Sequence, residues 1–318
     1  MKILLVKFDN IGDGIIFSSI IKPIKEGVAT AEIDILCQYK CMDIYKLNPY
    51  IEDIIFTENN KIPNLGKEYD ILINGHYSRT KFTDILCNLL KAKEKYAFLG
   101  DHCNISPQDK LIGNNYYNDL VETQENLELY KYRDLLKQIF NIDIKKEDLK
   151  PELYFKSRIE EYNLPKRFAV LVPYSAYPYK DYPEEKFYNA LKDYPLDIVI
   201  LGTEEQKEKA NYFSEKSKKF INLCGKTTLL ECMDIINNSE KVFGVDTGLI
   251  HVASALNKEN IVVVGQGHWK RFLPWSSSTK IVTGYDRYED ICPHYNCNWR
   301  CRYGNFQCVK MANLEDNL

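Results

Sequence analysis

Residues 241–256, KVFGVDTGLIHVASAL, contain an apolar strand, a polar turn and an apolar helix in one short run. The run predicts the end of a parallel strand at 242–243 and an amphipathic helix over 249–256. The turn between them carries Asp246, Thr247 and Gly248. Backbone N–H groups at the start of a helix have no intrahelical partner, and the helix dipole adds positive potential there. The stretch therefore predicts an α/β fold with a phosphate-type anion site at this turn.

Apolar runs of strand length recur along the chain, and most are continuous rather than alternating, as is typical of strands covered on both faces of a parallel sheet. Segments with helical periodicity lie between many of them, which predicts βαβ units. We therefore expect two doubly wound, Rossmann-like domains with about five strands each. The expected strands are 3–6, 33–36, 54–56, 71–73, 96–99, 168–172, 198–201, 220–223, 242–244 and 261–264, and the expected helices include 15–25, 127–140, 184–191, 205–219 and 229–237.

A polar, charge-rich stretch with two prolines, NIDIKKEDLKPELYFKSRIEEYNLPKR (141–167), separates the two sets of strands. We interpret it as a linker between domains over 1–155 and 156–318, the second ending in a cysteine-rich tail over about 290–318. Two facing doubly wound domains would place the carboxyl ends of both sheets around a central cleft. Open α/β sheets bind their ligands at such an edge.

The composition limits the classes of function. The 318 residues carry a net charge of −3, with 45% hydrophobic and 27% charged residues. The absence of a basic excess argues against a general nucleic-acid-binding role. No segment approaches the about 18 apolar residues of a membrane-spanning helix, and MKILLVKFDNIGDG at the start is no signal peptide. We expect a cytoplasmic protein with reduced thiols, in which Cys37, Cys41, Cys87, Cys103, Cys224 and Cys232 are packing residues.

Residues 4–25, LLVKFDNIGDGIIFSSIIKPIK, predict a strand, a glycine-containing turn and a helix. Gly12 and Gly14 permit a tight turn, but their spacing is not that of a dinucleotide-binding fingerprint. Asp13 is expected at the carboxyl end of the first strand, pointing into the cleft. It is either a helix N-cap or a general base that takes a proton from an acceptor hydroxyl.

Two more loops follow expected strands in the second half of the chain. In VLVPYSAYPYKDYPEEKF (170–187), Ser175 and Lys180 lie between a strand and a helix. A lysine there can neutralise a diphosphate, although an isolated lysine is more often a solvated surface residue. In VILGTEEQKEKA (199–210), Glu204 or Glu205 stands at a helix start. Such an acid either accepts hydrogen bonds from ribose hydroxyls or only complements the helix dipole.

The turn within 241–256 supplies the last group of candidates. Asp246 can cap the helix, and Thr247, Gly248 and Leu249 offer backbone amides. His251 is either a satisfied core histidine or faces the ligand, and its nearness to the predicted phosphate site favours the second interpretation. All these loops follow strand ends, and their agreement is a stronger indication than any one of them.

Residues 3–25, 171–187 and 221–266 resemble the three characteristic blocks of glycosyltransferase family 9, the family of ADP-heptose lipopolysaccharide heptosyltransferases. The most specific part is D-T-G-x-x-H at 246–251, with G-K-T before it at 225–227. The resemblance implies a GT-B fold, an inverting transfer without an organic cofactor, an acceptor on the N-terminal domain and a nucleotide sugar on the C-terminal domain. Tyr182-Pro183 stands where many members have Trp-Pro, which puts the identity of the sugar in doubt. The resemblance assigns the base to Asp13, and it assigns the donor to Ser175, Lys180, Glu204, Asp246, Thr247, Gly248, Leu249 and His251.

Four more cysteines lie within CPHYNCNWRCRYGNFQC (292–308), namely Cys292, Cys297, Cys301 and Cys308. Four thiols so close in a reduced compartment can bind Zn²⁺ or iron tetrahedrally and stabilise a tail with few apolar residues. Their spacing is not that of a common zinc finger, so a structural metal site and free thiols both remain open. The resemblance adds that some family members with protein acceptors carry a cysteine-bound iron near the C-terminus.

The sequence thus predicts an inverting glycosyltransferase that moves a sugar, heptose from ADP-heptose, to a hydroxyl of a glycan or lipid-linked glycan acceptor such as lipopolysaccharide core. No nucleic-acid partner is expected, and membrane association is at most peripheral, at the inner face of the cytoplasmic membrane. Three alternatives remain: transfer to serine or threonine of a protein, a non-catalytic nucleotide-sugar-binding protein, and a nucleotide epimerase of similar build.

Overall fold

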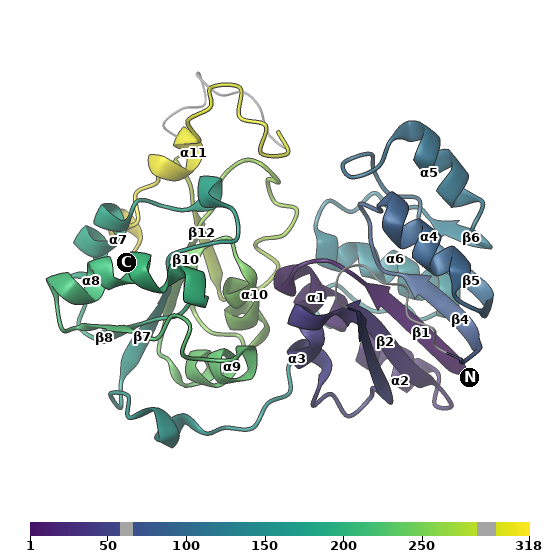
Figure 1. Ribbon diagram of the computed structural model, residues 1–318, viewed down its shortest axis with the longest axis horizontal. Helices are drawn as coiled ribbons and strands as arrows, with labels where there is room; N and C mark the ends of the chain where they lie inside the picture. Colours follow the sequence, from purple (N-terminus) through teal and green to yellow (C-terminus); the bar gives the residue numbers. More distant parts are fainter. Residues whose placement is uncertain (58–65, 285–296) are drawn as a thin grey trace. The chain divides into compact units, whose positions relative to one another are not determined.

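The computed structural model describes residues 1–57, 66–284 and 297–318. The chain divides into two compact units, Met1–Tyr154 and Phe155–Leu318 (Figure 1). The division lies inside the charge-rich stretch 141–167. Each unit is a parallel sheet with helices between successive strands, so the prediction of two doubly wound α/β domains is confirmed.

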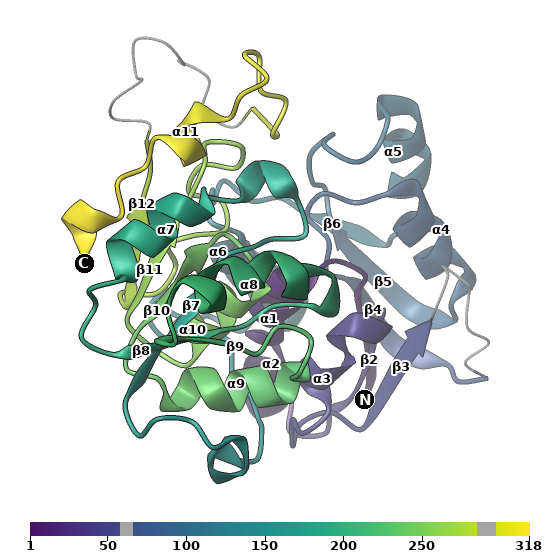
Figure 2. The same cartoon turned by 60° about the vertical axis from the view of Figure 1, so that its left-hand side comes forward.

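The first unit contains a six-stranded sheet in the order β3-β2-β1-β4-β5-β6. Figure 2 shows β3 beside β2. Strand β1 pairs in parallel with β2 on one side and with β4 on the other. The strand order therefore reverses between β1 and β4, which is where doubly wound sheets bind ligands. The strands are β1 (Lys2–Lys7), β2 (Glu32–Gln38), β3 (Asp53–Thr57), β4 (Tyr69–Asn74), β5 (Ala92–Phe98) and β6 (Asp119–Val121).

The helix expected over 15–25 is two helices, α1 (Ile11–Ser18) and α2 (Ile21–Gly27). Pro23 is the reason, because it has no N–H to bond the carbonyl four residues earlier. In the first turn of α2 that missing N–H does no harm, since it would have no intrahelical partner. The other helices of the unit are η1 (Tyr39–Cys41), α3 (Met42–Tyr45), α4 (Lys81–Leu89), α5 (Pro107–Asn114) and α6 (Glu128–Phe140).

The second unit contains another six-stranded parallel sheet, in the order β12-β11-β10-β7-β8-β9. Its order reverses between β7 and β10, which pair in parallel. The strands are β7 (Phe168–Val172), β8 (Asp197–Ile200), β9 (Phe220–Asn222), β10 (Val242–Val245), β11 (Asn260–Val263) and β12 (Thr279–Val282). The helices are η2 (Ile159–Tyr162), η3 (Pro178–Lys180), α7 (Glu184–Leu191), η4 (Glu204–Gln206), α8 (Lys207–Lys216), α9 (Leu229–Asn238), α10 (Gly248–Ala255), α11 (Gln307–Lys310) and η6 (Glu315–Asn317).

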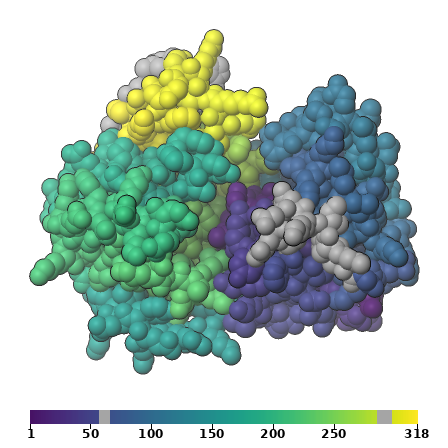
Figure 3. Space-filling model, viewed as in Figure 1, coloured from purple at the N-terminus to yellow at the C-terminus, as the bar shows by residue number. Residues whose placement is uncertain are grey.

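The C-terminal segment packs along the second unit, next to the loop and helix that follow β7 (Figure 3). The Tyr182 hydroxyl donates to the Ala312 carbonyl at 2.9 Å, and the Lys186 ammonium donates to the Lys310 carbonyl at 2.8 Å. Val309, Ala312 and Leu314 are buried in the core of the unit. These contacts explain how a short tail with few apolar residues is held in place.

The cysteines outside the C-terminal cluster were all expected to be packing residues, and one is not. Cys37, Cys41, Cys87, Cys224 and Cys232 are buried free thiols, and burial raises the pKa of each of them. Cys103 is exposed, on the loop before α5. Across the described parts of the chain, the structure contains no helix that is long and apolar enough to span a membrane.

Candidate functional site

The carboxyl ends of β7 and β10 bring two predicted site residues together. Lys180 ends the short helix η3 after β7, and Asp246 directly follows β10. The Lys180 Nζ atom lies 2.8 Å from an Asp246 carboxylate oxygen, and both side chains are largely buried, 15% and 11% exposed. Burial alone would raise the pKa of Asp246, but the charge and hydrogen bond of Lys180, together with the charges of His251 and His268, outweigh burial and lower the pKa. The site therefore contains a fixed carboxylate and a cation at the switch point of the sheet.

The helix after this carboxylate differs in one detail from the expectation. Thr247, and not Asp246, is the N-cap of α10, and its side chain makes no capping hydrogen bond. Asp246 pairs with Lys180 instead of the helix amides. Gly248 and Leu249 form the first turn of α10, so their N–H groups lie at the helix N-terminus as predicted. The end of α10 that attracts anions thus lies beside the Lys180 ammonium.

His251 lies in α10, where it is buried and also close to the ion pair, and its role toward a ligand stays a prediction. Its Nε2 atom lies 3.9 Å from Asp246. The Trp275 indole N–H donates to His251 Nδ1 at 3.1 Å, so Nδ1 accepts and the neutral ring carries its proton on Nε2. Burial lowers the pKa of His251 to about 4, so the ring is neutral at physiological pH.

Ser175 and Glu204 lie in the loops after β7 and β8. The Ser175 hydroxyl is buried and donates to the Tyr177 carbonyl at 2.7 Å, so it shapes the loop that leads to Lys180. Glu204 is 63% exposed and pairs with Lys207 at 2.9 Å. Its side chain crosses Gly225, where φ is +72° and an added Cβ would lie 1.9 Å from a Glu204 oxygen. Gly225 therefore leaves the room that Glu204 occupies.

Asp13 lies in the first turn of α1, the helix that follows β1. The N-cap of this helix is Asn10, so the interpretation of Asp13 as the N-cap is wrong. Lys7, at the end of β1, is buried and pairs with Asp9 at 2.8 Å. Burial opposes the charge of Lys7, but Asp9, Tyr132 and Asp13 together raise its pKa well above the ordinary value. A permanent cation therefore stands among the carboxylates after β1.

A chain of hydrogen bonds fixes the loop between β1 and α1. The Tyr117 hydroxyl donates to Asp84 at 2.8 Å, and the Asn74 amide donates to the Tyr117 oxygen at 2.7 Å. His76 Nδ1 lies 2.5 Å from the Asn74 oxygen, and His76 Nε2 accepts the Phe8 N–H at 2.7 Å. Since Nε2 accepts, the proton of the neutral ring is on Nδ1. The donor and the acceptor of each hydrogen bond are thus defined along the chain from the Asp84 carboxylate to the Phe8 amide.

These networks predict how stability depends on pH. Burial lowers the pKa of His76, His251 and His268 to about 4. The unfolded chain, with a histidine pKa of about 6.5, binds more protons than the folded chain between about pH 4 and 6.5. Stability is therefore expected to fall as the pH drops through this window, by about 2 kcal/mol per histidine between pH 7 and 5. Urea denaturation at pH 7, 6 and 5 measures the effect, and a constant free energy of unfolding over this range would contradict it.

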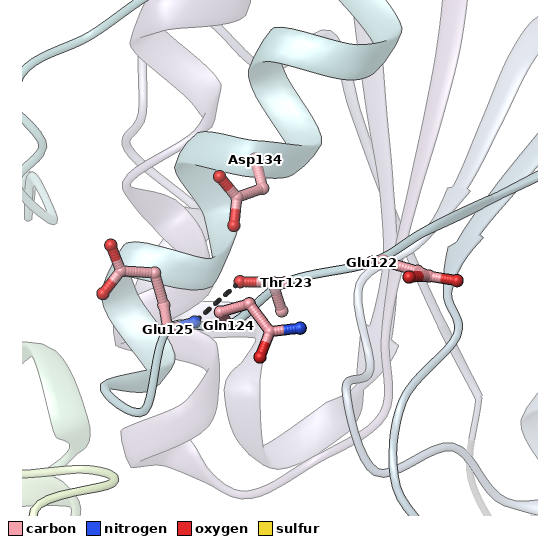
Figure 4. Close-up of a pocket in the computed structure, with 5 residues that line it drawn as sticks. All are labelled: Glu122, Thr123, Gln124, Glu125 and Asp134. Atoms are coloured by element: carbon pink, nitrogen blue, oxygen red, sulfur yellow. Dashed lines mark hydrogen bonds between the residues drawn. The ribbon is translucent and has the colours of Figure 1, made fainter.

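A cavity of about 600 Å³ lies at the carboxyl end of β6, and its lining is strongly polar (Figure 4). The Glu125 N–H donates to the Thr123 hydroxyl at 3.1 Å, and the Glu125 carboxylate pairs with Lys146 at 2.5 Å. None of the predicted site residues lines this cavity. Its carboxylates disfavour an anionic ligand. The lining residues are Glu122, Thr123, Gln124, Glu125 and Asp134.

The predicted cysteine metal site is only partly within the described structure, because Cys292 lies outside the described residues. Cys297, Cys301 and Cys308 are placed, and within residues 1–57, 66–284 and 297–318 no group of three or more potential ligands could hold a metal ion. Burial opposes ionisation of Cys301, but backbone N–H groups of residues 303–306 outweigh it and lower the pKa of the thiol. The described cysteines do not by themselves fit a metal centre.

Sequence reasoning did not single out several groups that the structure brings to these sites. Lys7 and His76 surround the start of α1, whereas Trp275, His268 and Trp299 surround the ion pair of the second unit. Lys7 directly follows the expected strand 3–6, and this position was a usable signal, whereas His76 lies two residues beyond the end of β4. Trp299 lies far along the chain from its partners, and nothing local in the sequence indicates its contact.

Solved structures similar to this chain share its fold. A glycosyltransferase family 9 protein from Veillonella parvula covers 99% of this chain and 94% of its own, with a TM-score of 0.78 and 14% identity. E. coli ADP-heptose lps heptosyltransferase II covers 89% and 90%, with a TM-score of 0.70 and 19% identity. The E. coli iron-containing dodecameric glycosyltransferase TibC covers 99% of this chain and 76% of its own, with a TM-score of 0.60 and 12% identity. The predicted GT-B fold is thereby confirmed.

Sequence comparisons give the family. Lipooligosaccharide heptosyltransferase 2 of Haemophilus influenzae is 36% identical over 69 residues, so the match spans only 21% of this chain and 20% of the relative. The family model of glycosyltransferase family 9 (heptosyltransferase) matches residues 64–302, which contain Lys180, Asp246 and His251. This match covers most of the chain, and the chain therefore belongs to glycosyltransferase family 9, the heptosyltransferase family.

Proposed function

We propose that this family 9 protein is an inverting glycosyltransferase that transfers heptose from ADP-heptose to a hydroxyl of a glycan such as lipopolysaccharide core. The observation that carries the proposal is the ion pair of Lys180 with Asp246 beside the N-terminus of α10, at the switch point of the second sheet. This combination of a cation and helix amides suits a diphosphate.

The leaving group gains negative charge as the bond from the sugar to the diphosphate breaks. Lys180 and the first N–H groups of α10 stabilise that charge in the transition state, because they are already held in place before the reaction. The neutral His251 offers its Nε2–H on the same helix. Glu204, exposed at the start of η4, is the acceptor for the ribose hydroxyls.

Asp13 of the first unit removes the proton of the acceptor hydroxyl, which attacks the anomeric carbon from the face opposite the diphosphate. Such an attack inverts the configuration at that carbon. The Asp13 charge helps to raise the pKa of the buried Lys7, so Lys7 stays charged near this carboxylate. The alternative acceptor is the hydroxyl of a protein serine or threonine.

A thermal-shift screen of ADP-, UDP-, GDP- and CDP-sugars tests the donor. ADP-heptose is expected to raise Tm most, since a ligand that binds only the folded state stabilises it by mass action. Release of ADP is then measured with lipopolysaccharide core and with a serine-rich peptide as acceptors. ADP release that needs an acceptor supports transfer and argues against an epimerase. No shift with any of the four donors would refute the proposal.

A further inference from the structure

Trp299, in the cysteine-rich segment, places its ring against the ammonium of Lys180, the lysine proposed to bind the nucleotide sugar. The Trp299 ring centroid lies 5.1 Å from Lys180 Nζ, while Asp246 lies 2.8 Å from the same nitrogen. An ammonium over the face of a tryptophan is attracted by the negative face of the ring, and more strongly where water is excluded. The Lys180 side chain is 15% exposed, so this attraction acts at a largely desolvated cation. Lys180 therefore has an aromatic partner in addition to the carboxylate.

The backbone at Trp299 is unusual for a bulky residue. Asn298 and Trp299 have φ angles of +49° and +58°, and the Arg300 N–H donates to the Cys297 carbonyl at 2.9 Å. Two successive left-handed residues in such a turn favour asparagine followed by glycine. Asn298 fits that preference and Trp299 does not. A large side chain kept in this conformation against its intrinsic preference points to a use for that side chain.

Two glycines after β11 form the surface on which the indole lies. A Cβ at Gly265 would lie 2.6 Å from the Trp299 ring, and one at Gly267 would lie 2.3 Å from it. The Asn298 N–H also donates to the Gly267 carbonyl at 2.9 Å. Any larger residue at either glycine would push the ring away from this position. The loop after β11 and the cysteine-rich turn are thus shaped to hold the indole in one place.

The same indole contacts the loop after β7, and its own N–H group makes no hydrogen bond to the described residues. Its ring lies 5.2 Å from that of Tyr179, the residue before Lys180. The Trp299 Nε1 atom is buried and has no hydrogen-bond acceptor among the parts of the chain that the structure describes. A buried N–H group without an acceptor is unfavourable. An anionic ligand at this site would supply an acceptor for the Trp299 N–H group.

We infer that Trp299 is a positioning residue of the donor site, which holds the Lys180 ammonium for the diphosphate of a nucleotide sugar. The inference rests on the proposed function and adds to it a residue from outside the loops that follow β7, β8 and β10. It gives the cysteine-rich segment a role in donor binding. The charge on Lys180 needs no new partner when the donor leaves, because Asp246 and the ring remain.

Trp299→Leu and Trp299→Phe test the inference by calorimetric titration with ADP and by steady-state kinetics. Trp299→Leu is expected to raise the Kd for ADP and the KM for the donor about 2- to 30-fold. The KM for the acceptor and kcat at saturating donor should change much less. Trp299→Phe keeps a ring face and should recover part of the loss, which also covers the case in which the leucine variant fails to fold. Tyr303→Leu is the matched control in the same segment, because Tyr303 is 48% exposed.

The outcomes separate the two proposals. If the wild-type protein binds ADP and both Trp299 variants bind it equally well, the inference is wrong and the proposed function stands. If the affinity for ADP and Tm both fall and the acceptor KM rises as well, Trp299 supports only the fold and the inference is again wrong. If the wild-type protein binds no nucleotide, the proposed function fails and the inference fails with it.

Discussion

Replacing Asp13 by asparagine is expected to lower kcat about 100- to 10,000-fold, the usual contribution of a general base. Asparagine has nearly the same shape but cannot take a proton from the acceptor hydroxyl. The affinity for ADP should stay close to that of the wild-type protein, because the proposed donor contacts are all in the second unit. Single-turnover kinetics with ADP-heptose and calorimetric titration with ADP measure the two quantities separately.

Asp109→Asn is the matched control for this variant. Asp109 occupies the same position in the first turn of α5 as Asp13 occupies in α1, the third helical residue. Its carboxylate pairs with Lys81 at 2.9 Å and accepts from Ser106 at 2.8 Å. The control therefore removes an equivalent helix-terminal charge away from the proposed chemistry and should leave kcat unchanged. Equal turnover of Asp13→Asn and wild type would remove Asp13 from the mechanism.

Replacing Lys180 by methionine is expected to have the largest effect on the second unit. The change removes the cation that holds the diphosphate, and ADP binding should become undetectable in a calorimetric titration. It also leaves Asp246 buried without its charge partner, which typically destabilises a fold by about 3–5 kcal/mol. Urea denaturation measures this loss. The double variant Lys180→Met with Asp246→Asn should recover most of the stability but none of the ADP binding.

Lys207→Met is the control for the lysine, since Lys207 forms an exposed pair with Glu204 at 2.9 Å. Exposed pairs contribute about 0–1 kcal/mol, so stability should change little. Retention of ADP affinity in Lys180→Met would show that the diphosphate is held elsewhere. If the double variant were no more stable than the single one, the buried ion pair would not be the source of the loss.

The sequence predicted the architecture well because the central strands are continuous apolar runs. All ten expected strands are present, whereas β6 (Asp119–Val121) and β12 (Thr279–Val282) were not predicted. Both are edge strands, where β6 has only three residues and β12 is exposed or half-buried at its two middle positions. Strands at the edge of a sheet are covered less completely, so they lack the apolar run by which buried strands are recognised.

The site was predictable as far as it depends on strand ends. Lys180, Asp246 and His251 meet because each follows a central strand, and parallel strands end at the same edge. The partner of Asp246 was not predictable, because capping of α10 and pairing with Lys180 both fit the sequence and burial decides between them. The Trp299 contact depends on how the C-terminal segment folds back over the loop after β11, which periodicity does not report.

The bond from the Phe8 N–H to His76 has a consequence for the protein in acid. Protonation of His76 would put a hydrogen on Nε2, so that two donors would face each other where one bond is made now. The main chain just before α1 would then lose one of its anchors, while the bond from the Gln38 amide to the Phe8 carbonyl remains. Inactivation by acid would thus begin at the entrance to the helix that carries Asp13, as a local opening that neutral buffer could reverse.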